Sequence, residues 1–102
     1  MGPRHRGREA ALRMLYQSDL SGDSIDAVIT AYFAGLAEED RDANVRRFAE
    51  HLARGVVRRR DELDELISAG SSHWRIERMA AVDRNVIRLA LFELFDDPGT
   101  PA

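Results

Sequence analysis

With 102 residues, of which 44% are hydrophobic and 32% charged, the chain suits one small globular domain and is too apolar for a disordered segment. It has no cysteine, which excludes disulfides and thiolate chemistry, and no apolar run approaches the roughly 20 residues of a membrane span. The net charge of −3 argues against a general nucleic-acid binder, and without a signal-peptide pattern we expect a cytoplasmic protein.

Positive charge is concentrated at the N-terminus, although the chain as a whole is acidic. Residues 1–20 carry four arginines against two acidic residues, a local balance of +2. The four are Arg4, Arg6, Arg8 and Arg13. Because a local basic patch can bind anions whatever the overall sign, this segment is the first candidate for a binding surface.

The spacing of apolar residues predicts helices throughout and no strand of alternating polarity. A first helix is expected over residues 8–20, after a flexible basic arm over residues 1–7, and a second over residues 24–36. A third, long helix is expected over residues 43–68, with Gly55 as a point of close packing. These three would form an antiparallel three-helix bundle over residues 8–68.

The last predicted helix, residues 83–95, follows a short helix over residues 73–79 and is apolar on almost every side. At 100° per residue, we expect one apolar side to be buried against the third helix. That side comprises Val86, Ile87, Leu91, Leu94 and Phe95. Leu89 and Phe92 fall between the charged Arg88 and Glu93, on the expected solvent side.

A helix that is apolar nearly all round needs neighbours on several sides, yet only a turn-rich tail over residues 96–102 follows this one. The sequence therefore predicts a flexible tail and an incomplete second subdomain over residues 72–95. We expect Leu89 and Phe92 to form an exposed apolar patch, through which the chain would form a homo-oligomer.

No pattern in the sequence supports catalysis or a cofactor. His5, His51 and His73 are scattered without partners at ligand spacing, so no metal site is predicted. The acidic residues 61–65 follow three arginines, a pattern typical of a solvated helix face crossed by ion pairs.

The basic N-terminal segment has two interpretations. Arg6, Arg13 and Gln17 share one helix face, and such a face can neutralise phosphates and stack on unpaired bases. The alternative is an ordinary solvated helix start, and the residues alone leave both open.

Two stretches resemble the NusB family of transcription antitermination factors. Residues 6–17 read RGREAALRMLYQ, which is similar to the family's R-x-R-E-x-A-x-x-x-L-Y opening. Residues 74–94 read WRIERMAAVDRNVIRLALFEL and are similar to its more specific W-x-x-x-R-x-x-x-V-D-R-x-I-L-R-x-x-x-x-E-L segment. The resemblance covers about residues 4–95.

The resemblance implies an all-α fold of two small helical bundles and binding to boxA-type RNA in ribosomal-RNA and phage leader transcripts. It also implies NusE, a small-subunit ribosomal protein, as a partner, and assembly on RNA polymerase. By position, it places RNA contacts at Arg4, Arg6, Arg8, Arg13, Tyr16 and Gln17. It places the NusE surface around Glu77, Asp83 and Arg84. Asp83 has a second interpretation, as the N-cap of the last helix.

The family continues with two further helices that complete the second bundle, and this sequence shows neither of their motifs. The expected architecture is therefore an N-terminal three-helix bundle with an incomplete second bundle, over residues 1–95. Two alternatives stay open. One is a truncated helical self-association module without RNA function, and the other is a NusB-like RNA-recruiting domain split from a ribosomal-RNA cytosine methyltransferase.

Overall fold

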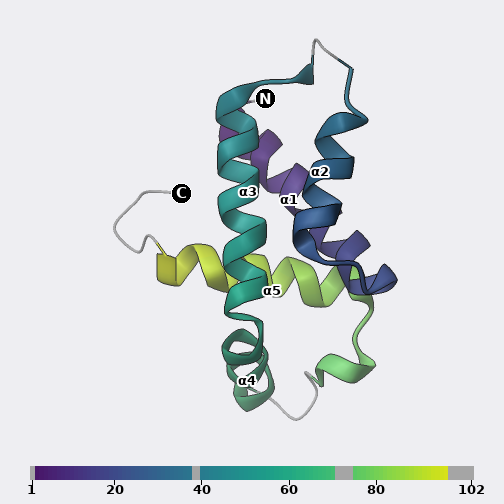
Figure 1. Cartoon of the computed structure of the whole chain (residues 1–102). Helices are drawn as coiled ribbons and strands as arrows, with labels where there is room; N and C mark the ends of the chain where they lie inside the picture. Colours follow the sequence, from purple (N-terminus) through teal and green to yellow (C-terminus); the bar gives the residue numbers. More distant parts are fainter. Residues whose placement is uncertain (1, 38–39, 71–74, 97–102) are drawn as a thin grey trace.

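A computed structural model describes residues 2–37, 40–70 and 75–96, and over these residues the chain is helical without any strand (Figure 1). The elements are α1 (Pro3–Ser21), α2 (Ile25–Ala34), α3 (Ala43–Arg58), α4 (Arg60–Gly70), the short 3₁₀ helix η2 (Ile76–Arg78) and α5 (Ala81–Asp96). The all-α prediction is confirmed. In the described part of the chain, no helix is long and apolar enough to cross a membrane.

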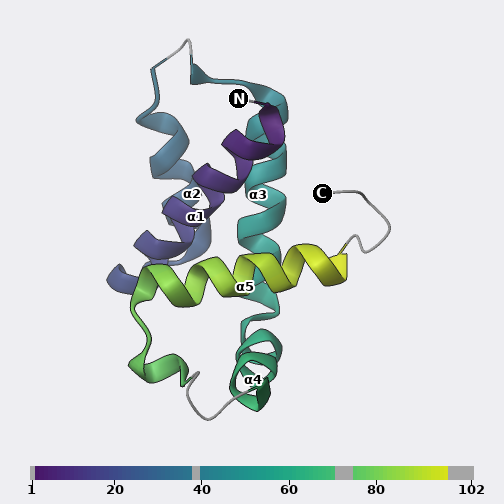
Figure 2. The same cartoon turned by 180° about the vertical axis from the view of Figure 1, so that it is seen from behind.

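Helices α1, α2 and α3 pack together, and α5 lies crosswise over α1 and α3, as Figure 2 shows from behind. Helix α4 extends beyond the end of α3 and packs against α5. The buried core is one cluster that runs from Ala10 and Met14 of α1 to Leu89 and Phe92 of α5. Within the described residues, the core is therefore continuous across the subdomain boundary expected near residue 70.

Helix α3 follows its sequence pattern closely. The Asp42 carboxylate caps its N-terminus by accepting from the backbone N–H groups of Asn44 and Val45, at 2.8 and 3.3 Å. The buried residues of its core face are spaced three and four positions apart, at Val45, Ala49, Leu52 and Val56. Gly55 is a close-packing point as predicted, because a Cβ there would overlap the ring of Phe92.

The flexible basic arm predicted over residues 1–7 is wrong for its described part. Helix α1 begins at Pro3, so Arg4 and Arg6 are helical. Proline suits the first helical position, because its φ is already helical and the N–H it lacks has no partner there. The predicted start at residue 8 overlooked this signal.

The single long helix predicted over residues 43–68 is also wrong. Its backbone breaks at Arg59, where φ is −106° and ψ is 16°, and α4 begins at the next residue. Helix α4 buries Leu63 completely and packs against α5. We attribute the break to this tertiary packing, which outweighs a continuous helical repeat in the sequence.

The predicted orientation of the last helix is reversed. Leu89 and Phe92 are buried, with 7% and 1% of their surface exposed, so neither forms an apolar patch for self-association. Three residues expected inside, Val86, Leu94 and Phe95, are 44%, 61% and 47% exposed, while Ile87 and Leu91 are partly buried. The reversal has a physical cause: Arg88 lies on the inward face and is satisfied there by acidic partners.

Smaller differences concern the ends of elements. Helix α5 begins at Ala81, so Asp83 lies within its first turn and is not its N-cap. In place of the short helix expected over residues 73–79, the structure has the three-residue η2. Residues 73 and 74 of the expected helix lie outside the described range, as does most of the predicted tail.

Candidate nucleic-acid interface

Phe48 on α3 brings together two of the four N-terminal arginines. The guanidinium carbons of Arg4 and Arg8 lie 5.0 and 5.7 Å from the centre of its ring. The ring packs on Gly7, where an added Cβ would come within 2.6 Å of a ring carbon. Because a cation–π contact uses the flat face of a guanidinium, it orients these arginines without occupying their N–H donors.

Arg8 has a second partner on α5. Its Nε lies 2.8 and 3.0 Å from the two carboxylate oxygens of Glu93, and both side chains are partly buried. This ion pair links the first helix to the last. Among the four arginines, Arg8 is therefore the one most engaged in holding the fold.

Arg6 and Arg13 lie on another face of α1, together with Gln17. The Arg6 guanidinium is 3.5 Å from the Asp42 carboxylate, and the Arg13 guanidinium is 2.9 Å from Glu9, one turn away. These arginine side chains are 47% and 65% exposed. Pairs so exposed contribute little to stability, so these arginines can exchange a carboxylate for a phosphate at small cost.

Tyr16 and Gln17 are both exposed on the same helix, and 38% of the tyrosine surface is accessible. Arg6 and Arg13, seven residues apart, are separated by about 10 Å along the helix axis. The structure thus divides the predicted RNA contacts between two faces of α1, one beside Phe48 and one beside α2.

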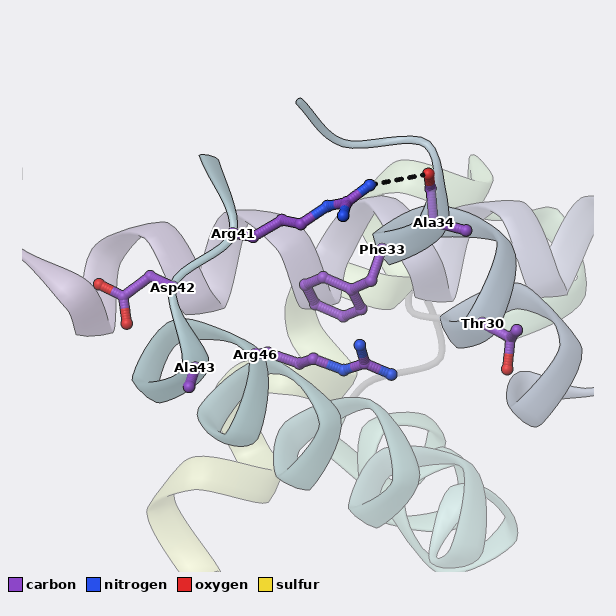
Figure 3. Close-up of a pocket in the computed structure, with 7 residues that line it drawn as sticks. All are labelled: Thr30, Phe33, Ala34, Arg41, Asp42, Ala43 and Arg46. Carbon is purple, nitrogen blue, oxygen red and sulfur yellow. Dashed lines mark hydrogen bonds between the residues drawn. The ribbon is translucent and has the colours of Figure 1, made fainter. Parts of the chain in front are cut away.

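A cleft of about 550 Å³ between α2 and α3 lies beside Arg6, since Asp42 lines it. Figure 3 shows Arg41 and Arg46 reaching towards Phe33 from opposite sides. The Arg46 guanidinium lies 4.9 Å from the ring centre, and the Arg41 side chain donates to the carbonyl oxygens of Ala34 and Leu36. Arg41 therefore satisfies carbonyl groups at the C-terminal end of α2 and has a structural role.

The residues predicted to bind a protein partner lie on η2 and at the start of α5. Glu77 and Asp83 are exposed. Arg84 is turned inward: its Nε and one Nη donate to the Asp19 carboxylate at 2.7 and 3.0 Å, and its other Nη donates to the Met79 carbonyl at 3.2 Å. Arg84 therefore supports this surface from within.

Arg84 belongs to a polar network between α1, α4 and α5 that the sequence interpretation missed. Arg88 is only 4% exposed and donates to both oxygens of Asp64, at 2.7 and 2.8 Å. It also contacts Asp19 at 3.3 Å, and Asn85 donates to the same carboxylate at 2.9 Å. Within the described residues, no buried side-chain nitrogen or oxygen lacks a hydrogen-bond partner.

The network changes the acidity of Asp19. The hydrogen bond from Arg84 lowers the pKa of this carboxyl; burial opposes the shift, and Asn85 and the charge of Arg88 add to it. The same contact raises the pKa of Arg84. Both groups are therefore held in their charged forms.

A sequence signal for this network existed. Asn85 and Arg88 are three residues apart in a helix that is otherwise largely apolar, so they share one face. Their acidic partners are distant in sequence, and nothing local indicates which of the acidic residues will face them. Phe48 shares the apolar repeat of α3, which by itself indicates a core position and gives no local sign of the two arginines over its ring.

The structure offers no support for a metal centre. In residues 2–37, 40–70 and 75–96, no three His, Cys, Asp or Glu side chains are grouped to hold an ion. His5 and His51 lie in separate pairs, with Glu9 at 3.8 Å and Asp96 at 2.6 Å. His73 lies outside the described residues.

Comparison with known proteins identifies the family. The model of the NusB family matches residues 5–102. The chain belongs to the NusB family. The transcription antitermination protein NusB of Myxococcus xanthus (strain DK1622) is 42% identical over 102 residues, which are 99% of this chain and 73% of that protein. The protein of the same name from Anaeromyxobacter dehalogenans (strain 2CP-1 / ATCC BAA-258) is 46% identical over 91 residues, 89% of this chain and 63% of the relative.

A solved structure shares the fold of the chain. A chain in "Crystal Structure of a Plectonemic RNA Supercoil" superposes with a TM-score of 0.84 at 27% identity, covering 97% of this chain and 73% of that one. The match therefore extends over nearly the whole of this NusB-family chain. This chain spans 63% to 73% of the length of these three proteins.

Proposed function

We propose that this NusB-family chain binds single-stranded RNA through α1 and acts in transcription antitermination. The observation that carries the proposal is the surface position of Arg4, Arg6, Arg8 and Arg13 on one helix, each oriented by a neighbouring side chain. Oriented guanidinium groups suit phosphate binding, and the adjacent Tyr16 and Gln17 supply stacking and hydrogen-bonding groups for bases. The names of the relatives support the antitermination role.

The proposed RNA is of the boxA type found in leader transcripts, and the proposed protein partner is NusE, with which the chain would join RNA polymerase. Glu77 and Asp83 present exposed carboxylates, which suit a basic ribosomal protein. Asp83→Asn keeps the size of the side chain and removes its charge. We expect this variant to bind NusE more weakly, and unchanged binding would exclude the charge of Asp83 from the partner surface.

The RNA proposal is tested by the salt dependence of binding. Three or four phosphate contacts to single-stranded RNA give a log–log salt slope of roughly −2 to −3, at about 0.7 per contact. An Arg6→Ala/Arg13→Ala variant should flatten this slope by about one to two units, measured by fluorescence anisotropy with a short labelled boxA-type RNA.

The matched control is an Arg58→Ala/Arg60→Ala variant, which removes the same charge from exposed positions where α3 meets α4. Arg58 is ten residues, or about 15 Å, from Phe48 along α3. The control should keep the parent slope within about half a unit, because it removes no proposed phosphate contact. If the α1 variant keeps the parent slope, the RNA surface lies elsewhere.

A further inference from the structure

A groove of about 580 Å³ lies between α1 and α2, on the side of α1 that carries Arg13 and Gln17. The residues that give it its character are Arg13, Gln17, Asp23, Ala27, Ala31 and Tyr32. Tyr32 fits the apolar repeat of α2, but it is only partly buried and lines this groove.

The α2 wall of the groove is small and apolar, with one rigid ring. Ala27 and Ala31 lie one helical turn apart, and both are exposed. Because both are alanines, each presents only a methyl group to the groove. The Tyr32 ring is held edge-on against Phe33, with ring centres 5.1 Å apart and planes at 85°. An aromatic ring fixed in this way loses little freedom when a flat ligand stacks on it.

The polar groups of the groove are of the kinds that form hydrogen bonds with the edge of a nucleobase. One Nη of Arg13 is held by Glu9, which leaves further N–H donors on the same guanidinium. The Gln17 amide offers a donor and an acceptor, and the Asp23 carboxylate offers acceptors. Among the described residues, neither of these two side chains is hydrogen-bonded to another protein group.

We propose that the groove between α1 and α2 binds one unstacked base of the RNA strand. The base lies against the Tyr32 ring, its edge faces the Gln17 amide and the Asp23 carboxylate, and Arg13 contacts the phosphate beside it. This inference rests on the proposed RNA function and adds a base-recognition site to a surface otherwise argued from phosphate contacts. Single-stranded RNA is commonly recognised in this way, with splayed bases stacked on aromatic side chains.

The sharpest test fills the groove without changing any charge. Ala31→Leu places a larger apolar side chain where the base would lie, at an exposed position where the fold tolerates it. Binding of a short single-stranded RNA should weaken by about tenfold, within the range for loss of one base stack. The salt slope should stay at the parent value, because the phosphate contacts remain. Ala69→Leu, at an exposed position near the end of α4, is the matched control and should bind as the parent does.

A second variant removes the ring. Tyr32→Leu keeps an apolar side chain in the wall and should lose a similar factor, with Phe95→Leu on the exposed face of α5 as its control. Polyphosphate has no bases, so it should bind the parent and the Ala31→Leu variant equally.

The outcomes separate the two proposals. If the parent shows no salt-dependent RNA binding, the proposed function fails. If the parent binds RNA with the expected slope and Ala31→Leu binds equally well, the function stands and the base site is wrong. In that second case, the groove would be free for another occupant, such as an apolar peptide side chain.

Discussion

Helices α1 and α5 both carry arginines, but α1 exposes Arg6 and Arg13 to solvent whereas α5 turns Arg84 and Arg88 inward. On α1, Arg6 and Arg13 are well exposed and pair with carboxylates that are also exposed. On α5, Arg88 is almost completely buried, and Arg84 is 19% exposed at the side chain. The difference shows that the number of arginines on a helix does not indicate whether their charge is available for a ligand.

The positions of the acidic partners determine which arginines are buried and which are exposed. Asp19 at the end of α1 and Asp64 on α4 meet the inward face of α5, where they satisfy two guanidinium groups and the Asn85 amide. Burial of a charge is costly unless it is paired and hydrogen-bonded, and here the pairing is complete. We therefore assign Arg84 and Arg88 to folding and propose that the exposed Arg6 and Arg13 serve binding.

The largest expected effect is on the α5 side of this comparison. Arg88→Met removes the buried guanidinium and leaves Asp64 without its bidentate partner. Because breaking a buried ion pair leaves an uncompensated charge, the free energy of unfolding should fall by about 3–5 kcal/mol in urea titrations. Arg58→Met, at an exposed position, should change it by less than about 0.5 kcal/mol. Equal losses in the two variants would contradict the assignment.

Asp19 is expected to give a smaller, pH-dependent effect. Arg84 holds the pKa of Asp19 below its ordinary value of 3.8, so the folded protein binds fewer protons than the unfolded chain near this pH. The stabilisation is complete above the ordinary pKa and is lost as the pH falls through the lower folded value. Asp19→Asn should be less stable than the parent at neutral pH, by about 1–3 kcal/mol for charged hydrogen bonds.

The same variant has no carboxyl at position 19 to titrate. In urea titrations repeated from neutral pH to below about pH 4, its stability should therefore decline less steeply than that of the parent. Parallel declines would remove Asp19 as a contributor to acid sensitivity.

The smallest expected effect is on the outward face of α5. Leu94 is 61% exposed, so Leu94→Gln should change the free energy of unfolding by less than about 0.5 kcal/mol. The orientation predicted from sequence places Leu94 in the core, where such a change costs several kcal/mol. Thermal unfolding therefore distinguishes the two orientations of the helix.

Much of the fold could be predicted from the sequence, because the repeat of apolar residues in α2 and α3 matches the buried positions. Val28, Ile29 and Phe33 face the core as their spacing indicates. The orientation of α5 could not be predicted, since its apolar residues surround the helix and favour no single face. Its inward side is set by Asp19 and Asp64, which are 69 and 24 residues away from Arg88.

The candidate site was predicted in part. Arg4, Arg6, Arg8 and Arg13 could be named from local charge and family resemblance, and the structure places all four on the surface of α1. Their division between the Phe48 side and the α2 side depends on how α1 crosses α3. That crossing requires the close contact between Gly7 and Phe48, which no local pattern reveals.

The central claim is that the exposed Arg6 and Arg13 of α1 serve RNA binding and that Arg84 and Arg88 of α5 serve the fold. It is tested most directly by thermal unfolding with and without saturating single-stranded RNA. A ligand that binds only the folded state raises the Tm, so one measurement reports both stability and binding. Arg13→Gln should keep the Tm of the free protein and reduce the RNA-induced increase. Arg84→Gln should lower the Tm of the free protein and keep that increase. The account is contradicted if Arg84→Gln abolishes the RNA-induced increase while the Tm of the free protein stays at the parent value.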